Sequence, residues 1–110
     1  MLYEVVFAPE ADDHLEELFA YIADRASVLT AERYTATVVA TCEDLTRFPH
    51  RGVPRDDIRP GLRVTHHKGR TIVAYAIDEP NLRVTILSVY HGGQDYESKL
   101  DLEDSDDEPT

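Results

Sequence analysis

Three arginines and a histidine in the second half of the sequence have the chemistry to hold and cleave a phosphodiester. The candidate cations are Arg63, Arg70 and Arg83, and the candidate proton carriers are His91 and Tyr90. An RNase that works without a metal needs both kinds of group, because cations neutralise the charge that develops and a side chain must move protons. Proton transfer depends on geometry that a sequence does not contain, so RNA cleavage is one hypothesis among others.

A polar segment with paired glycines, His91-Gly92-Gly93-Gln94-Asp95, follows the last predicted strand. The glycines permit a backbone with positive φ and the close approach of another chain, and Asp95 can accept hydrogen bonds from nearby backbone N–H groups. The segment is either a shaped strand exit or an edge that a partner or target protein contacts. The predicted contact residues are Arg63, Arg70, Tyr90, His91, Gly92 and Asp95.

The other histidines, tyrosines and the cysteine considered for chemistry are expected to have structural roles. His66 and His67 are adjacent on a predicted strand and point to opposite faces, so they make a poor pair of metal ligands. Cys42, the only cysteine, lies on the apolar stripe of a predicted helix and is expected in the core. Tyr75 and Tyr90 are expected to be half-buried strand aromatics. We therefore expect no metal, no cofactor and no thiol chemistry.

Charge is unevenly distributed along the chain. The net charge is -11, but residues 101–110 hold six acidic groups and no basic one, which leaves -5 for residues 1–100. Residues 47–70 form a basic band, with seven Arg or Lys against Asp56 and Asp57. The seven are Arg47, Arg51, Arg55, Arg59, Arg63, Lys68 and Arg70. An acidic protein with such a band can address a polyanion or an acidic partner.

A chain of 110 residues can form one hydrophobic core but not two. We expect one domain over residues 1–100 and a disordered acidic tail over residues 101–110. The tail has the opposite charge to the basic band, so a sharper hypothesis is that it folds over the band and competes with an anionic partner. No run approaches the roughly 18 apolar residues of a membrane span, and a basic signal region is absent, so we expect a cytoplasmic protein.

Apolar periodicity predicts a strand followed by two helices. Residues 2–7 alternate as a strand does, and an apolar stripe at helical spacing runs from about Pro9 to Arg25. A second helix is predicted with Thr30 as its N-cap and Pro49 closing it. Two amphipathic helices joined by a few residues form a hairpin that must lay its apolar stripe on a sheet.

The remaining chain predicts that sheet. A loop over residues 49–61, rich in proline and glycine, leads to strands at 62–67, 71–77 and 83–90. The turns between these strands are short, so neighbouring strands should be antiparallel. The predicted order is β-α-α-β-β-β, an α+β domain of two layers in which the helical hairpin packs on an antiparallel sheet.

In this order, several segments resemble the ParE branch of the RelE/ParE superfamily, the toxins of bacterial type II toxin–antitoxin pairs. They are PEADDHLEELFAYIA in the first helix, LTRFPHRG at the end of the second, PGLR at 60–63, GRTIVAYAI in the middle strand and ILSVYHGGQDYES at the last. The resemblance covers roughly residues 2–97. Ala8 stands where members often have a Ser or Thr cap, a side chain commonly worth about 1 kcal/mol.

The resemblance implies a toxin that inhibits DNA gyrase, and so replication, by binding rather than by catalysis. It also implies a ParD-like antitoxin that holds the toxin inactive, with DNA contacted only indirectly through that antitoxin. Two alternatives stay open. One is a ribosome-dependent mRNA endonuclease of the RelE type, although that branch typically has further Arg or Lys where this chain has Gly92-Gly93-Gln94. The other is a module that binds an antitoxin without being toxic.

Overall fold

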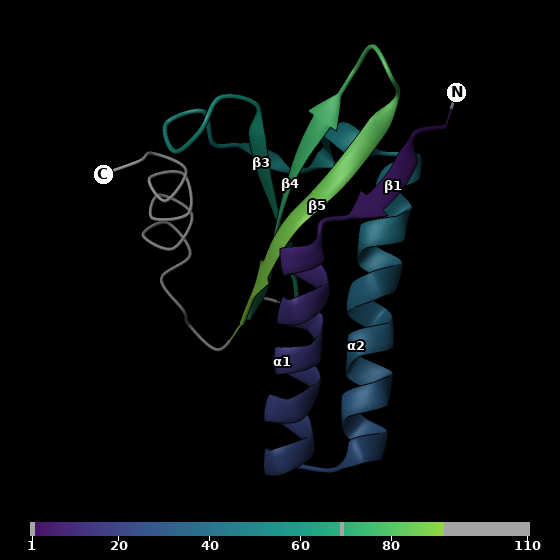
Figure 1. Ribbon diagram of the computed structural model, residues 1–110, viewed down its shortest axis with the longest axis vertical. Helices are drawn as coiled ribbons and strands as arrows, with labels where there is room; N and C mark the ends of the chain where they lie inside the picture. Colours follow the sequence, from purple (N-terminus) through teal and green to yellow (C-terminus); the bar gives the residue numbers. More distant parts are fainter. Residues whose placement is uncertain (1, 69, 92–110) are drawn as a thin grey trace.

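The computed structural model describes residues 2–68 and 70–91, which form a sheet with two helices on one face (Figure 1). The α-helices and strands are β1 (Glu4–Phe7), α1 (Pro9–Arg25), α2 (Val28–Glu43), β2 (Val53–Pro54), β3 (Leu62–His67), β4 (Thr71–Asp78) and β5 (Arg83–Tyr90). Two short 3-10 turns, Asp44–Thr46 and Pro49–Arg51, link α2 to β2. The predicted contact residues Gly92 and Asp95, and the acidic segment 101–110, lie outside the described residues.

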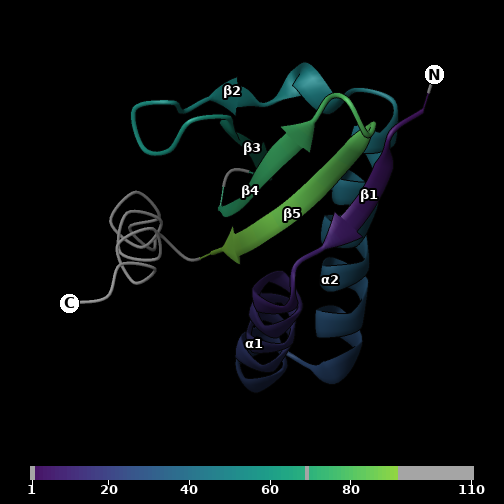
Figure 2. The same ribbon diagram turned by 45° about the horizontal axis from the view of Figure 1, so that its top comes forward.

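The strand order of the sheet is β1-β5-β4-β3-β2 (Figure 2). β3, β4 and β5 pair antiparallel, as the short turns between them predict. β1 adds to β5 in parallel, with Glu4 opposite Arg83 and Phe7 opposite Ile86, so the sheet is mixed and not wholly antiparallel. Parallel neighbours need a long crossover, and the helical hairpin lies in the chain that separates β1 from β5. Turn lengths therefore carry no information on the direction of β1.

The helical hairpin has the predicted layout with corrections at both ends of α2. The helix ends at Glu43 and not at Pro49, because the chain tightens into the 3-10 turn Asp44–Thr46. α1 spans Pro9–Arg25 as predicted, and Ala8 precedes it without a side-chain cap. The N-cap of α2 is Ser27 and not Thr30, because the Ser27 hydroxyl accepts the N–H of Thr30 at 3.0 Å. The intervening Val28–Leu29 pair is exposed and interrupts the apolar stripe, although it forms the first turn of the helix. Neither α1 nor α2 is long and apolar enough to cross a membrane, and these are the α-helices of the described residues.

The main core lies between the helices and one face of the sheet. Leu18 of α1 and Val38 and Cys42 of α2 pack there with Tyr75 of β4. Cys42 is fully buried, as predicted, and burial together with the charge of Glu43 raises its pKa to about 12, so its thiol is inert at neutral pH. A second, smaller cluster lies on the opposite face and consists of Leu62, Val64, Ala74 and Tyr90.

Candidate functional site

The structure separates the four residues predicted for a nuclease site. Arg83 begins β5 and His91 follows its last residue, so roughly 26 Å of extended chain lies between them. Arg83 is also engaged, since its Nε donates to Glu4 Oε1 at 3.0 Å. Arg63 lies in a third place, beside the loop that follows α2. Of the four, only Arg70 and His91 line the same cleft.

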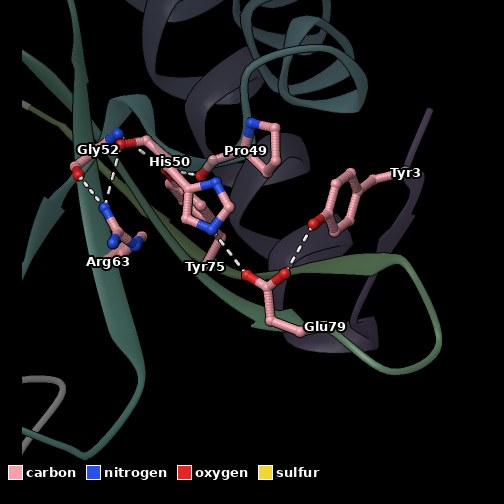
Figure 3. A network of polar contacts seen from close by, with 7 residues as sticks. All are labelled: Tyr3, Pro49, His50, Gly52, Arg63, Tyr75 and Glu79. Atoms are coloured by element: carbon pink, nitrogen blue, oxygen red, sulfur yellow. Dashed lines mark hydrogen bonds and ion pairs between the residues drawn. The ribbon is translucent and has the colours of Figure 1, made fainter. Parts of the chain in front are cut away.

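Arg63 is part of a polar network that fastens the loop after α2 to the sheet (Figure 3). Its Nη1 donates to the carbonyl oxygens of His50, at 3.0 Å, and Gly52, at 2.7 Å. The buried Tyr75 hydroxyl donates to the Pro49 carbonyl oxygen at 2.7 Å and accepts the N–H of Gly52 at 2.9 Å. A Cβ on residue 52 would lie 2.5 Å from that hydroxyl oxygen, so a larger residue cannot fit unless Tyr75 moves.

Glu79, in the turn between β4 and β5, extends this network to the first strand. Its Oε2 accepts the Tyr3 hydroxyl at 2.7 Å, and its Oε1 lies 2.6 Å from His50 Nε2. The hydrogen bonds from Tyr3 and His50 hold the pKa of Glu79 below its usual value, and the bond to Glu79 raises the pKa of Tyr3. We call the seven residues of Figure 3 the loop network: Tyr3, Pro49, His50, Gly52, Arg63, Tyr75 and Glu79. Its polar groups bind the chain itself, so its role is structural.

A cleft lies at the other end of the sheet, where β4 begins and β5 ends. Its volume is about 290 Å³, and we call it the aromatic cleft. Its lining residues are Leu18, Tyr21, Ile22, Thr30, Tyr34, Arg70, Thr71 and His91. A second hollow of about 280 Å³ shares Thr30 and Tyr34 with it and adds Arg33, Thr37 and Lys68. Tyr34 therefore stands between two hollows, one aromatic and one basic.

The side chains of the aromatic cleft are stacked and partly tied to one another. The Tyr21 ring lies 4.6 Å from the His91 ring, and the Arg25 guanidinium carbon lies 3.8 Å from the Tyr21 centroid. The Tyr34 hydroxyl is 2.6 Å from Thr71 Oγ1. Burial is the largest of the causes that lower the pKa of His91, so its imidazole is neutral at pH 7. The cleft can thus accept an apolar group on aromatic faces, with exposed Arg70 beside it to meet an anion.

Behind Tyr34 lies a buried histidine whose partners sequence reasoning missed. The His67 Nε2 is 3.0 Å from Thr37 Oγ1, and its Nδ1 is 2.8 Å from Thr41 Oγ1. Burial lowers the pKa of His67. The Thr37 hydroxyl donates to the Tyr34 carbonyl at 2.6 Å and the Thr41 hydroxyl to the Thr37 carbonyl at 3.1 Å, so either hydroxyl oxygen can accept the N–H of the neutral ring. The four-residue spacing of Thr37 and Thr41 on one helix face is the signal that could have located this site. As predicted, His66 points to the opposite, exposed face.

A larger groove runs between the two helices, with a volume of about 680 Å³. Its apolar surface comes from Leu15, Phe19, Ala36 and Val39. Its acidic side chains are Glu16, Glu32 and Glu43. An apolar floor with carboxylates around it suits an amphipathic segment that carries basic side chains.

Two tyrosines, one in β4 and one at the end of β5, are more deeply buried than predicted. Tyr75 and Tyr90 are 0% and 3% exposed, so both are buried rather than half-buried. The Tyr90 ring lies 5.3 Å from the His14 ring, and His14 Nδ1 accepts the N–H of Val89 at 3.1 Å. A partner could reach little of Tyr90 in this arrangement.

Within residues 2–68 and 70–91, no three His, Cys, Asp or Glu side chains gather to hold a metal.

The fold is similar to those of several solved proteins from toxin–antitoxin systems. A chain of the chromosomal ParDE system of P. aeruginosa matches with a TM-score of 0.70 at 14% identity, over 82% of this chain and 96% of that one. A chain of a RelBE toxin–antitoxin complex from Mycobacterium tuberculosis is 29% identical, with a TM-score of 0.64 over 84% and 100% of the two chains. A free RelE variant of E. coli, at 11% identity, has a TM-score of 0.65 over 94% and 98%.

Sequence comparison gives a more specific answer. The search of curated proteins found no match. The sequence model of the ParE toxin of type II toxin–antitoxin systems, parDE, matches residues 5–96, which include both helices, all the strands except the first residue of β1, and the aromatic cleft. This confirms the family predicted from the sequence segments. The chain belongs to the ParE toxin family of type II toxin–antitoxin systems.

Proposed function

We propose that this chain is a toxin that inhibits DNA gyrase by binding it, and that a ParD-like antitoxin neutralises it. Membership of the ParE family supports the proposal. The observation that carries it against a catalytic alternative is the dispersal of the candidate nuclease residues. Arg63 binds backbone carbonyls, and Arg83 pairs with Glu4 at the far end of β5 from His91. A transition state that needs several cations around one phosphate is not served by these predicted residues, of which only Arg70 and His91 line one cleft.

The groove between the helices supports the antitoxin part of the proposal. Leu15, Phe19 and Val39 give it an apolar floor, and the glutamates beside them favour Lys or Arg on the incoming segment. β2 covers only Arg63 and Val64 of β3, so the rest of that strand offers an edge for strand addition. The antitoxin would then lay an amphipathic helix in the groove and a strand on the sheet, which makes a heteromeric complex the resting state.

The endonuclease alternative rests on the cleft that Arg70 and His91 share, with Arg33 and Lys68 in the adjoining hollow. A neutral His91 could accept a proton from a ribose 2′-hydroxyl, and Arg70 could hold the phosphate. This alternative predicts that Arg70→Ala or His91→Ala abolishes RNA cleavage on the ribosome. The binding proposal predicts that no variant of either residue changes RNA integrity.

Pulse-labelling of DNA, RNA and protein synthesis after induction of the chain alone separates these functions. The proposal predicts a prompt fall in DNA synthesis with a DNA-damage response, while protein synthesis continues at first. A prompt fall in protein synthesis with cut mRNA would replace the proposal with the endonuclease. If all three rates stayed normal, the chain would be a non-toxic antitoxin-binding module. Co-expression of the antitoxin is the control, and it should restore DNA synthesis.

A further inference from the structure

Three cations lie beside Tyr34, and none of them has a carboxylate partner among residues 2–68 and 70–91. Arg33 and Lys68 line the basic hollow on one side of the ring, and Arg70 lines the aromatic cleft on the other. Within the described residues, none of the three takes part in an ion pair. In contrast, Arg55, which belongs to the same basic band as Lys68 and Arg70, is paired with Asp57 at 2.8 Å. Cations left unpaired beside a cleft are available to an anionic ligand.

The aromatic cleft itself is apolar at its base. Leu18 is buried there, Ile22 is half-buried, and Tyr21 is 39% exposed. The N-terminus of α2 lies close by, since Thr30 in its first turn lines both hollows. The partial positive charge of a helix N-terminus adds to the field of the three cations. The surface thus offers one apolar pocket with three cations beside it, while Glu17 and Arg25 act on His91 with opposite signs.

We propose that the aromatic cleft and the basic hollow together bind an acidic peptide segment of a partner protein, which inserts one apolar side chain beside Tyr21 and Tyr34. The carboxylates on either side of that anchor would meet Arg70 in one direction and Arg33 and Lys68 in the other. A cavity of about 290 Å³ has room for one branched or aromatic side chain. This site is separate from the groove between the helices, whose glutamates favour the opposite charge.

Charge favours a peptide over a nucleic acid as the occupant. The chain carries a net charge of -11, and residues 1–100 alone carry -5. A long polyanion meets this whole field and would be repelled outside the cleft, whereas a short acidic segment meets only the local cations. The aromatic faces of Tyr21 and Tyr34 provide the apolar contact, and the cations provide the specificity for acidic neighbours.

Fluorescence anisotropy with the full-length chain tests the proposal. The probe is a short labelled peptide of Asp and Glu with one central Phe, and its matched control has Ala in place of Phe. We expect the Phe peptide to bind more tightly, and added salt to weaken both. Arg70→Ala should weaken the Phe peptide about tenfold, as the loss of one charge-assisted contact would. Arg47→Ala is the matched control at the opposite end of α2, and it should change binding less than twofold, about the limit of the assay.

A second variant tests the contribution of the peptide's apolar side chain separately from that of its charge. Tyr21 is exposed, so Tyr21→Ala should fold normally and should abolish the difference between the Phe and Ala peptides. Equal affinity of the two peptides for the native chain, or equal effects of Arg70→Ala and Arg47→Ala, would overturn the proposal. So would tighter binding of a single-stranded oligonucleotide of equal charge. Peptide binding seen only after removal of residues 101–110 would assign the cleft to the chain's own acidic end and not to a partner.

Discussion

Polar side chains gather at both ends of the sheet, and the two groups differ in what they contact. In the loop network, Arg63 binds two carbonyl oxygens and the Tyr75 hydroxyl binds a carbonyl and an N–H group of the loop. At the aromatic cleft, Arg70 is exposed and makes no ion pair within the described residues. Residue type alone therefore does not show whether an arginine is structural or available to a ligand. The contacts that each arginine already makes in the fold do show this, and variants at each end of the sheet can test the difference.

The largest effect is expected at Gly52, in the loop network. Gly52→Ala would place a Cβ 2.5 Å from the Tyr75 hydroxyl oxygen, and the ring is fully buried and cannot move aside easily. Strain and lost hydrogen bonds should lower the free energy of unfolding by about 3 kcal/mol. Urea unfolding measures this. Gly61→Ala is the control, because φ is +80° there but no atom lies within 4 Å, so about 1 kcal/mol is expected. Equal losses would contradict the close contact.

Tyr75→Phe should have the next largest effect. It removes the hydroxyl and leaves the Pro49 carbonyl and the Gly52 N–H without their bonds, both in buried residues. Such unsatisfied groups cost about 2 kcal/mol together. Tyr3→Phe is the matched control in the same network, and its loss should be smaller because its bond to Glu79 is exposed. A stable Tyr75→Phe protein would show that the loop is not fastened by this hydroxyl.

A pH effect is expected from His67, behind the aromatic cleft. Burial lowers its folded-state pKa below the ordinary 6.5, so the unfolded chain takes up a proton more readily than the folded chain. Stability should be full above pH 6.5 and fall as the pH drops toward the folded-state pKa, by at most about 1.4 kcal/mol per pH unit for this group. Thermal melts from pH 7.5 to 5 measure the slope, and His67→Gln should reduce it. His66→Gln should leave it unchanged, and equal slopes in both variants would rule His67 out.

The smallest stability effects should come from the exposed arginines. Arg83→Ala breaks an ion pair with Glu4 in which both side chains are about half exposed, so unfolding should change by less than about 0.5 kcal/mol. Arg70→Ala should be equally mild for stability, but it should weaken growth inhibition on induction, whereas Arg83→Ala should not. Unfolding curves and growth curves of the two variants provide the comparison. Loss of toxicity in both, or in neither, would remove the functional distinction between the cleft and the rest of the sheet.

Local patterns predicted most of the elements. The bounds of α1, β3 and β5 follow directly from periodicity and turn residues, because these signals lie within each segment. The parallel pairing of β1 with β5 could not be predicted in this way, since Glu4 and Arg83 meet only after the helical hairpin has folded. The cap at Ser27 was missed for a local reason, because exposed Val28 and Leu29 conceal the start of α2.

The candidate site was predictable only in part. The sequence identified Arg70 and His91 as residues of interest, and they do line one cleft. It could not show that Arg63 is held by the loop, nor that Tyr34 separates the cleft from a basic hollow. Such contacts join residues far apart in the chain, and side-chain partners at that range leave no periodic pattern.

A supercoiling assay with purified DNA gyrase tests the central claim most directly. The full-length chain and its Arg83→Ala variant would be titrated against gyrase and relaxed plasmid, with ribosomes and an mRNA in a parallel reaction. The account predicts loss of supercoiling with both proteins, recovery on addition of the antitoxin, and intact mRNA throughout. Unchanged supercoiling together with cleaved mRNA would contradict it and identify the chain as an endonuclease.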